Sequence, residues 1–214
     1  MKKHRRQVLG LLAAAPFAGS AAMARTTAPA ETPAPVRPRV RLETPQGPIV
    51  IELYTDKAPI TAANFLRYVD EKRYVGAHFY RSIRFSGAGM ENYGLLQGGL
   101  NGSGRPLPPI VHEPTTQTGL SHKDGAVSLA RETPGSGKSE FFICLGDMSN
   151  GLDADPKSPG DNLGYAVFGQ IVEGKEVALA LQKAPLSATK GAEFGMKGQM
   201  LDPVIPIPAM TRVS

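Results

Sequence analysis

The stretch SEFFICL, residues 139–145, carries five apolar residues in a row, Phe141 to Leu145, directly after a polar pair. A short apolar run of this kind, preceded by a Gly-rich loop, is typical of a strand buried on both faces. Cys144 is the only cysteine of the chain, so no internal disulfide can form. We expect Cys144 to be a small buried hydrophobe, because a catalytic thiol would need a neighbouring base and the sequence identifies none.

Similar short runs lie on both sides of this stretch. Val40, Leu42 and Thr44 alternate with polar residues, and the alternation resumes at Ile49 after a turn, which predicts a hairpin with one buried face. Helical periodicity predicts two helices, at residues 58–72 and 175–182. Further strands are expected at residues 78–83, 95–97, 126–130, 165–171 and 204–213. This pattern predicts a mainly β fold, a small closed barrel capped by two helices.

The first 38 residues are not expected to belong to the folded domain. Residues 1–24 have a basic start, a short apolar stretch and the pattern Ala22-Met23-Ala24, which together predict a signal peptide. The pair Arg5-Arg6 resembles a twin-arginine export signal, and an ordinary secretory signal is the alternative. Residues 25–38, rich in Ala, Pro and Thr, predict a linker. The domain is therefore expected over residues 39–214.

Export has consequences for location and partners. Either type of signal would place the mature protein in the periplasm or otherwise outside the cytoplasm. The apolar stretch of the signal is too short to span a bilayer, so no stable membrane insertion is expected after cleavage. The formal charge of +5 is concentrated in the signal, and without residues 1–24 the chain has 20 basic and 19 acidic residues. A nearly neutral domain gives no reason to expect nucleic-acid binding.

Three local patterns resemble known sites but lack the required spacing. Gly137-Lys138-Ser139 resembles the end of a phosphate-binding loop, but Glu132 stands where the first glycine is required, and a strand follows in place of a helix. An acidic cluster and a set of histidines also lack the spacing of calcium or zinc ligands; these are Asp153, Asp155, Asp161, His78, His112 and His122. We therefore expect no metal site.

Several blocks, in a fixed order, resemble the cyclophilin family over about residues 42–181. They are Tyr54–Phe65, Phe79-Tyr80-Arg81, Leu95–Gly99, Ser128–Arg131, Ser139–Cys144 and Val167-Phe168-Gly169. The resemblance suggests a divergent, exported bacterial cyclophilin. It implies a closed eight-stranded antiparallel β-barrel capped by two α-helices, with peptidyl-prolyl cis-trans isomerase activity and no metal or cofactor. The expected substrates are proline-containing polypeptides, and the expected state is a monomer.

The resemblance also assigns roles to single residues on the outer face of the barrel. Arg81 matches the catalytic arginine, Gln97 the glutamine that positions the substrate, and Phe142 the floor of the proline pocket. Leu95 stands where the family usually has Met, and Leu152 matches a wall of the pocket. Further substrate-binding positions are Ala130 and Arg131 along the peptide backbone, and Glu140 and Tyr165 at the rim.

These residue types suit the reaction. Rotation about a peptide bond costs about 18–20 kcal/mol because C–N resonance is lost, and X–Pro bonds exchange in tens to hundreds of seconds. In the twisted state the proline nitrogen regains a lone pair. A guanidinium that donates to this nitrogen binds the twisted state better than the planar one, which lowers the barrier. Arginine suits this role because it stays charged and presents several donors.

Some positions depart from the family pattern. About eight extra residues lie between Arg81 and Gln97, at 84–92, and a second insertion covers 154–164. Gly94 stands where the family has an aromatic residue, and Tyr93 or Tyr80 could fill that space. Glu140 stands where the family has Gln, and Tyr165 where it has His. The family's pocket tryptophan is absent, because the chain has none. Two functions therefore remain open: an isomerase that assists folding of exported proteins, or a peptide-binding chaperone module with little or no catalysis.

Overall fold

The computed structural model describes residues 36–90, 92–155, 157 and 162–213. These residues belong to one folded unit, residues 35–214. The predicted signal peptide, almost all of the predicted linker and part of the insertion at 154–164 lie outside the described residues. Within the described residues no helix is both long and apolar enough to cross a membrane.

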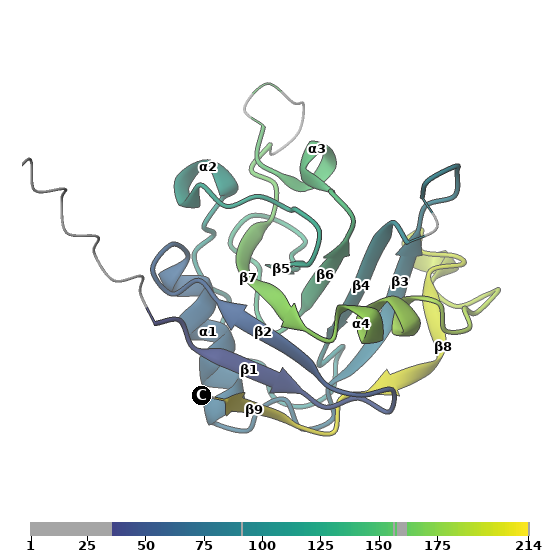
Figure 1. The fold of residues 1–214 in the computed structure, drawn as a ribbon, viewed down its shortest axis with the longest axis horizontal. Helices are drawn as coiled ribbons and strands as arrows, with labels where there is room; N and C mark the ends of the chain where they lie inside the picture. The colour runs from purple at the N-terminus through teal and green to yellow at the C-terminus, as the bar shows by residue number, and fades with distance from the viewer. Residues whose placement is uncertain (1–35, 91, 156, 158–161, 214) are drawn as a thin grey trace, which may run out of the picture. The chain divides into compact units, whose positions relative to one another are not determined.

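Nine β-strands of the described residues form a single antiparallel sheet in the order β8-β3-β4-β6-β5-β7-β2-β1-β9 (Figure 1). The mainly β prediction is confirmed, and each predicted strand except the last lies within about two residues of its observed position. The strands are β1 (Arg39–Leu42), β2 (Ile49–Leu53), β3 (His78–Arg84), β4 (Gly94–Gly99), β5 (Ala126–Leu129), β6 (Phe141–Leu145), β7 (Ala166–Glu173), β8 (Met200–Pro206) and β9 (Met210–Val213).

The predicted closed eight-stranded barrel is wrong, because the sheet is curled but open, with β8 and β9 at its two edges. The predicted last strand, residues 204–213, is two strands: β8 pairs with β3 and β9 pairs with β1. Residues 207–209 interrupt them, and Pro208 lacks the N–H that a continuous ladder would need. The chain thus crosses from one edge to the other without a β8–β9 hydrogen-bond ladder (Figure 1).

Both predicted helices are confirmed, as α1 (Pro59–Asp70) and α4 (Lys175–Gln182). The start of α1 lacks a side-chain cap from Ala58. Instead, the buried carboxylate of Glu113 accepts hydrogen bonds from the backbone N–H groups of Ile60 (3.2 Å) and Thr61 (2.7 Å). A negative group at a helix N-terminus satisfies free N–H donors and complements the helix dipole. The short elements α2 (Thr115–Thr118), α3 (Ser149–Leu152) and the 3₁₀ helix η1 (Ala192–Phe194) were not predicted.

Strand β6 divides its side chains between two apolar clusters, because successive side chains of a strand point to opposite faces. Phe141, Ile143 and Leu145 belong to the main core inside the curl of the sheet. Phe142 and Cys144 belong to a second cluster with Leu95, Ala126 and Val167. The second cluster lies on the opposite face of β6, where the candidate site is built.

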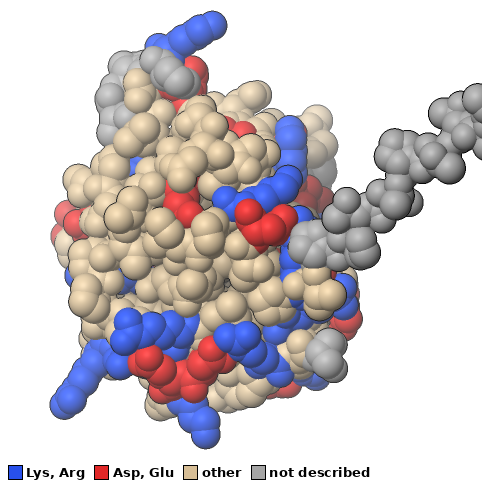
Figure 2. Space-filling model, turned by 90° about the vertical axis from the view of Figure 1, so that its left-hand side faces the viewer, with Lys and Arg blue, Asp and Glu red and all other residues tan. Residues whose placement is uncertain are grey.

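The charged residues visible on one face of the protein are interspersed by sign (Figure 2). At the end of α1 and beside it, Arg67 and Arg73 both pair with Glu71, and Arg212 pairs with Asp70. At the end of α1, basic side chains are therefore paired with acidic ones.

Candidate active site

The sheet register brings the three predicted central residues onto neighbouring strands. In the β3–β4 pair Arg81 lies opposite Gln97, and in the β4–β6 pair Gln97 lies opposite Phe142. The ladder therefore fixes the order Arg81, Gln97, Phe142 across three adjacent strands. Residues 16 and 61 positions from Arg81 become its neighbours because antiparallel pairing joins distant segments.

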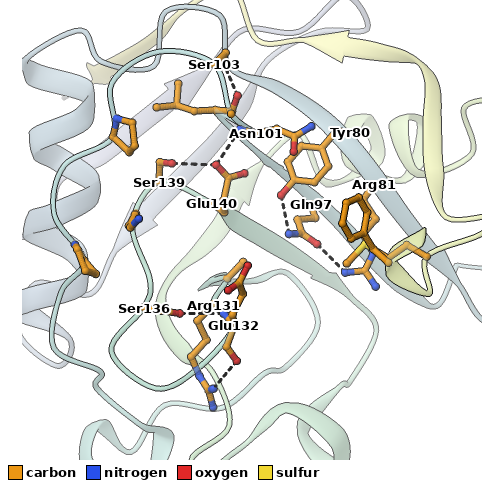
Figure 3. Close-up of a pocket in the computed structure, with 18 of the residues that line it drawn as sticks. Tyr80, Arg81, Gln97, Asn101, Ser103, Arg131, Glu132, Ser136, Ser139 and Glu140 are labelled. Atoms are coloured by element: carbon orange, nitrogen blue, oxygen red, sulfur yellow. Dashed lines mark hydrogen bonds between the residues drawn. The ribbon is translucent and has the colours of Figure 1, made fainter. Parts of the chain in front are cut away.

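Arg81 donates a hydrogen bond from Nη1 to Oε1 of Gln97, at 3.1 Å, and Gln97 donates from Nε2 to the hydroxyl of Tyr80, at 2.7 Å (Figure 3). Both ends of the Gln97 amide are therefore engaged, which fixes its orientation. Partial burial lowers the pKa of Arg81 from its ordinary value, but an arginine remains protonated at neutral pH. The result is a charged, half-buried guanidinium with a defined direction.

Tyr80 is the aromatic residue that contacts Gln97, so one of the two substitutes suggested for Gly94 lies at the site. Burial, followed by the charge of Glu140, raises the pKa of Tyr80 well above its usual value, which keeps the hydroxyl protonated. Tyr93 instead packs edge-on against Phe85 in the extra residues between β3 and β4, with 5.7 Å between ring centroids. These extra residues form the connection at the end of the β3–β4 hairpin.

Gln199 is a residue of the site that the sequence did not reveal. Its Oε1 accepts hydrogen bonds from Nε of Arg81, at 2.9 Å, and from Nη2, at 2.6 Å. Its backbone carbonyl also accepts from Ser82 N, at 2.8 Å, which ties the residue to β3. Gln199 lies in a Gly-rich turn just before β8, and nothing in that turn marks it as functional.

Phe142 forms the centre of the second apolar cluster. Leu95 belongs to this cluster, and Leu152 and Tyr165 pack against it. The rings of Phe142 and Tyr165 meet edge to face at 5.3 Å and 89°, a favourable aromatic geometry. The three residues predicted to contact the proline ring, Phe142, Leu95 and Leu152, therefore lie together beside Gln97, with the predicted rim residue Tyr165 packed against them.

His122 lies beneath this cluster and was considered only as a possible metal ligand. Its ring stacks on Phe142, with 5.8 Å between centroids and an interplanar angle of 11°. The imidazole is fully buried: Nδ1 donates to Oδ1 of Asp153, at 2.6 Å, and Nε2 accepts from Oγ of Ser128, at 2.9 Å. The carboxylate only accepts, so Nδ1 carries a proton, and Nε2 is the acceptor when the ring is neutral.

The remaining predicted residues line a cavity of about 690 Å³ next to the cluster. Arg81 and Gln97 line it from the strands, and Ala130, Arg131 and Glu140 line it from the loop between β5 and β6 and the start of β6 (Figure 3). Arg131 lies over the Tyr165 ring, 5.2 Å from its centroid, and donates from Nε to the carbonyl of Gly164, at 2.9 Å.

Glu140 has an unusual environment for a carboxylate. Its Oε1 accepts hydrogen bonds from Asn101 N, at 3.0 Å, and from Ser139 Oγ, at 2.9 Å. Its Oε2 is buried and has no hydrogen-bond partner among the described residues. It lies against Gly99, where an added Cβ would come within 2.5 Å of this oxygen. Only glycine at position 99 therefore leaves room for the carboxylate.

The site combines an oriented guanidinium, a cavity of about 690 Å³ and an apolar cluster around Phe142 on the outside of a curled sheet. Residues 39–200 match the family model described as cyclophilin type peptidyl-prolyl cis-trans isomerase/CLD. The chain belongs to the cyclophilin family and is a peptidyl-prolyl cis-trans isomerase.

Individual proteins give the same result. A peptidyl-prolyl cis-trans isomerase of Acinetobacter baylyi is 35% identical over 152 residues, which cover 69% of this chain and 73% of that protein. The isomerase cyp18 of Streptomyces antibioticus is 33% identical over 156 residues, covering 71% and 87%. In fold, the chain is similar to a Cryptosporidium parvum cyclophilin type isomerase, with a TM-score of 0.63, 21% identity, and coverage of 84% and 99%. That protein has also been solved in the presence of the dipeptide Ala-Pro.

Proposed function

We propose that this isomerase acts on X–Pro bonds of exported polypeptides and that Arg81 is its catalytic residue. The observation that carries the proposal is the Arg81 guanidinium, oriented by Gln97 at the edge of a cavity and next to the apolar cluster around Phe142. The proline ring would occupy the apolar cluster, and the peptide on its N-terminal side would run along Ala130, Arg131 and Glu140.

In this mechanism the guanidinium donates a hydrogen bond to the proline nitrogen only when the amide is twisted. Rotation about the X–Pro bond pyramidalises the proline nitrogen, and a positive N–H donor stabilises the lone pair that appears there. Because the planar amide lacks this lone pair, the interaction is stronger in the transition state than in the bound ground state. Gln97 holds the carbonyl side of the bond, and Phe142, Leu95 and Leu152 contact the ring.

An isomerisation assay on a short X–Pro peptide tests the role of Arg81. Loss of a single preorganised donor typically costs about 10²–10³-fold in kcat, so Arg81→Ala should lose at least that much while it still binds peptide. Arg81→Lys keeps the positive charge but loses the guanidinium that hydrogen-bonds to both Gln97 and Gln199, so its kcat should lie between those of wild type and Arg81→Ala. The matched control is Arg41→Ala, a partly exposed arginine of β1 that pairs with Glu43. Equal activity of wild type and Arg81→Ala would refute the role of Arg81.

The same experiment separates the chaperone alternative. Glu140 and Tyr165, which depart from the family pattern at the rim, are the features that favour it. Peptide binding without isomerisation in the wild type would support that alternative and contradict the proposed catalytic function.

We also propose that the protein is exported, on the strength of residues 1–24. Cell fractionation of a bacterium that expresses the full chain tests this, with recovery of a shortened mature form in the periplasm as the expected result. The double variant Arg5→Lys, Arg6→Lys blocks a twin-arginine route but leaves an ordinary secretory signal active. Full-length protein confined to the cytoplasm would contradict export.

A further inference from the structure

The connection between α4 and β8 forms a third side of the cavity that Arg81 and Gln97 line. It runs from residue 183 to residue 199 and contains η1, which lies between two glycines in the left-handed region, Gly191 (φ 80°) and Gly195 (φ 71°). Backbone hydrogen bonds close the turn on itself: Met196 N donates to Gly191 O at 2.7 Å, and Gln199 N donates to Met196 O at 3.0 Å. The turn over residues 191–200 is therefore a structured element of the site.

This turn is fixed against the proposed catalytic residue. Met200 is the β-pair partner of Arg81, and the side chain of Gln199 makes the two hydrogen bonds to the Arg81 guanidinium. An added Cβ on Gly191 would come within 2.7 Å of Met200 Cγ, so a glycine is needed for this close approach. The distance between the turn and Arg81 is thus set by backbone pairing and by side-chain hydrogen bonds.

The side chains that the turn contributes to the cavity are apolar. Phe194, Met196 and Met200 line the same cavity as Arg81 and Gln97. Phe194 is 73% exposed, compared with 44% for Phe85, another exposed phenylalanine of the described residues. An aromatic side chain held in solvent on a structured turn, beside a binding cavity, is typical of a recognition site, because its burial on binding is favourable.

The charges of the turn do not favour a charged ligand. Lys190 is paired with Asp202, at 2.9 Å. Glu193 and Lys197, which flank Phe194 and Met196, carry opposite charges. An apolar group is therefore the ligand that this surface fits best.

We infer that Phe194 and Met196 form a binding subsite for an apolar side chain of the polypeptide substrate, next to the X–Pro pair. The inference rests on the proposed function, because the subsite is continuous with the cavity that holds Arg81. It would make the enzyme prefer clients with Leu, Met or Phe close to the proline, as found in segments that are exposed before folding is complete. Methionine suits such a surface because its flexible thioether adapts to different partners. Phenylalanine suits it because its ring offers a large apolar surface.

Four peptides test the inference. Two have Leu or Ser directly before an Ala-Pro pair, and two have Leu or Ser directly after it, with small residues elsewhere. Isomerisation is followed by NMR exchange spectroscopy, and the dissociation constant is measured in parallel. Wild type should prefer Leu to Ser at one of the two positions by about threefold to tenfold in kcat/KM, as expected for partial burial of one apolar side chain.

The variants Phe194→Ser and Met196→Ser, alone and combined, should remove this preference, so that the ratio of kcat/KM for the Leu peptide to kcat/KM for the Ser peptide falls to about one. Urea denaturation shows whether the variants are folded. The matched control is Val75→Ser, because Val75 is 75% exposed and lines a separate pocket beside α1; it should keep the preference.

A wild type that isomerises all four peptides equally would overturn the subsite, as would a preference that survives the double variant. If no peptide is isomerised, the proposed function fails, and the dissociation constants decide the subsite: tighter binding of a Leu peptide that is lost in the double variant supports it, and equal binding overturns it.

Discussion

Oε1 of Gln199 accepts two hydrogen bonds from Arg81, from Nε at 2.9 Å and from Nη2 at 2.6 Å, although the residues are 118 positions apart in the chain. Gln97 takes the remaining contact, at Nη1. Two neutral acceptors therefore hold the guanidinium from both sides before any substrate binds. Preorganisation of this kind contributes to catalysis because the donor does not have to reorient in the transition state.

Gln199→Ala should lower kcat by about tenfold and leave KM nearly unchanged, because it frees the orientation of Arg81 without removing a substrate contact. Gln199→Glu should also lower kcat, since a carboxylate on the guanidinium offsets its charge at the proline nitrogen. The control is Gln170→Ala on β7, where the amide donates to Asp124 O. A rise in KM with unchanged kcat would show that Gln199 binds substrate and does not position Arg81.

Glu140→Gln should stabilise the protein by about 1 kcal/mol, because it removes the charge from a group with a buried, unpaired oxygen. Urea denaturation at neutral pH measures this gain. Glu132→Gln, an exposed carboxylate of the same cavity, is the control. A Glu140→Gln variant that is no more stable than wild type, or that gains no more than Glu132→Gln does, would contradict this account.

Cys144 should be unreactive in the native protein. It is fully buried in the cluster around Phe142, and burial raises the pKa of its thiol, so the reactive thiolate is scarce. A thiol-specific disulfide reagent should modify the chain in urea, with one equivalent per chain, and should react at least about 100-fold more slowly in its absence. Rapid native modification would show that the cluster opens frequently.

The sequence predicted strand positions well because alternation and short apolar runs are local signals. Local signals also placed Phe141 and Phe142 in one strand. They could not tell which of the two faces the main core, because that depends on the direction in which the sheet curls. The closed barrel was wrong because only the pairing partners of β8 and β9 decide whether the edges meet. Gln199 and His122 were missed for a related reason: their roles arise from contacts with Arg81 and Asp153, far away in the sequence.

The last prediction concerns pH, and it depends on the buried contact between His122 and Phe142. The titratable groups that face His122 are Asp153, which accepts its Nδ1–H, and Tyr165, whose ring meets the imidazole edge on. Arg131 lies over the Tyr165 ring. Burial lowers the pKa of His122 below its usual 6.5, although Asp153 opposes this shift. The folded protein therefore holds the imidazole neutral.

Because the unfolded imidazole binds a proton near pH 6.5 and the folded one only at lower pH, this residue makes stability fall as the pH drops below about 6.5. The stability is fully present above that pH. His122→Asn cannot titrate, so urea denaturation from pH 8 to pH 5 should show a flatter pH profile than wild type, and His78→Asn, at a partly exposed histidine, should keep the wild-type slope. Since the imidazole of the folded protein takes up a proton only at lower pH, kcat/KM of the folded wild type should stay level as the pH first drops below 6.5 and should fall only where the folded imidazole is protonated. An identical slope in wild type and His122→Asn would show that other groups cause the acid sensitivity.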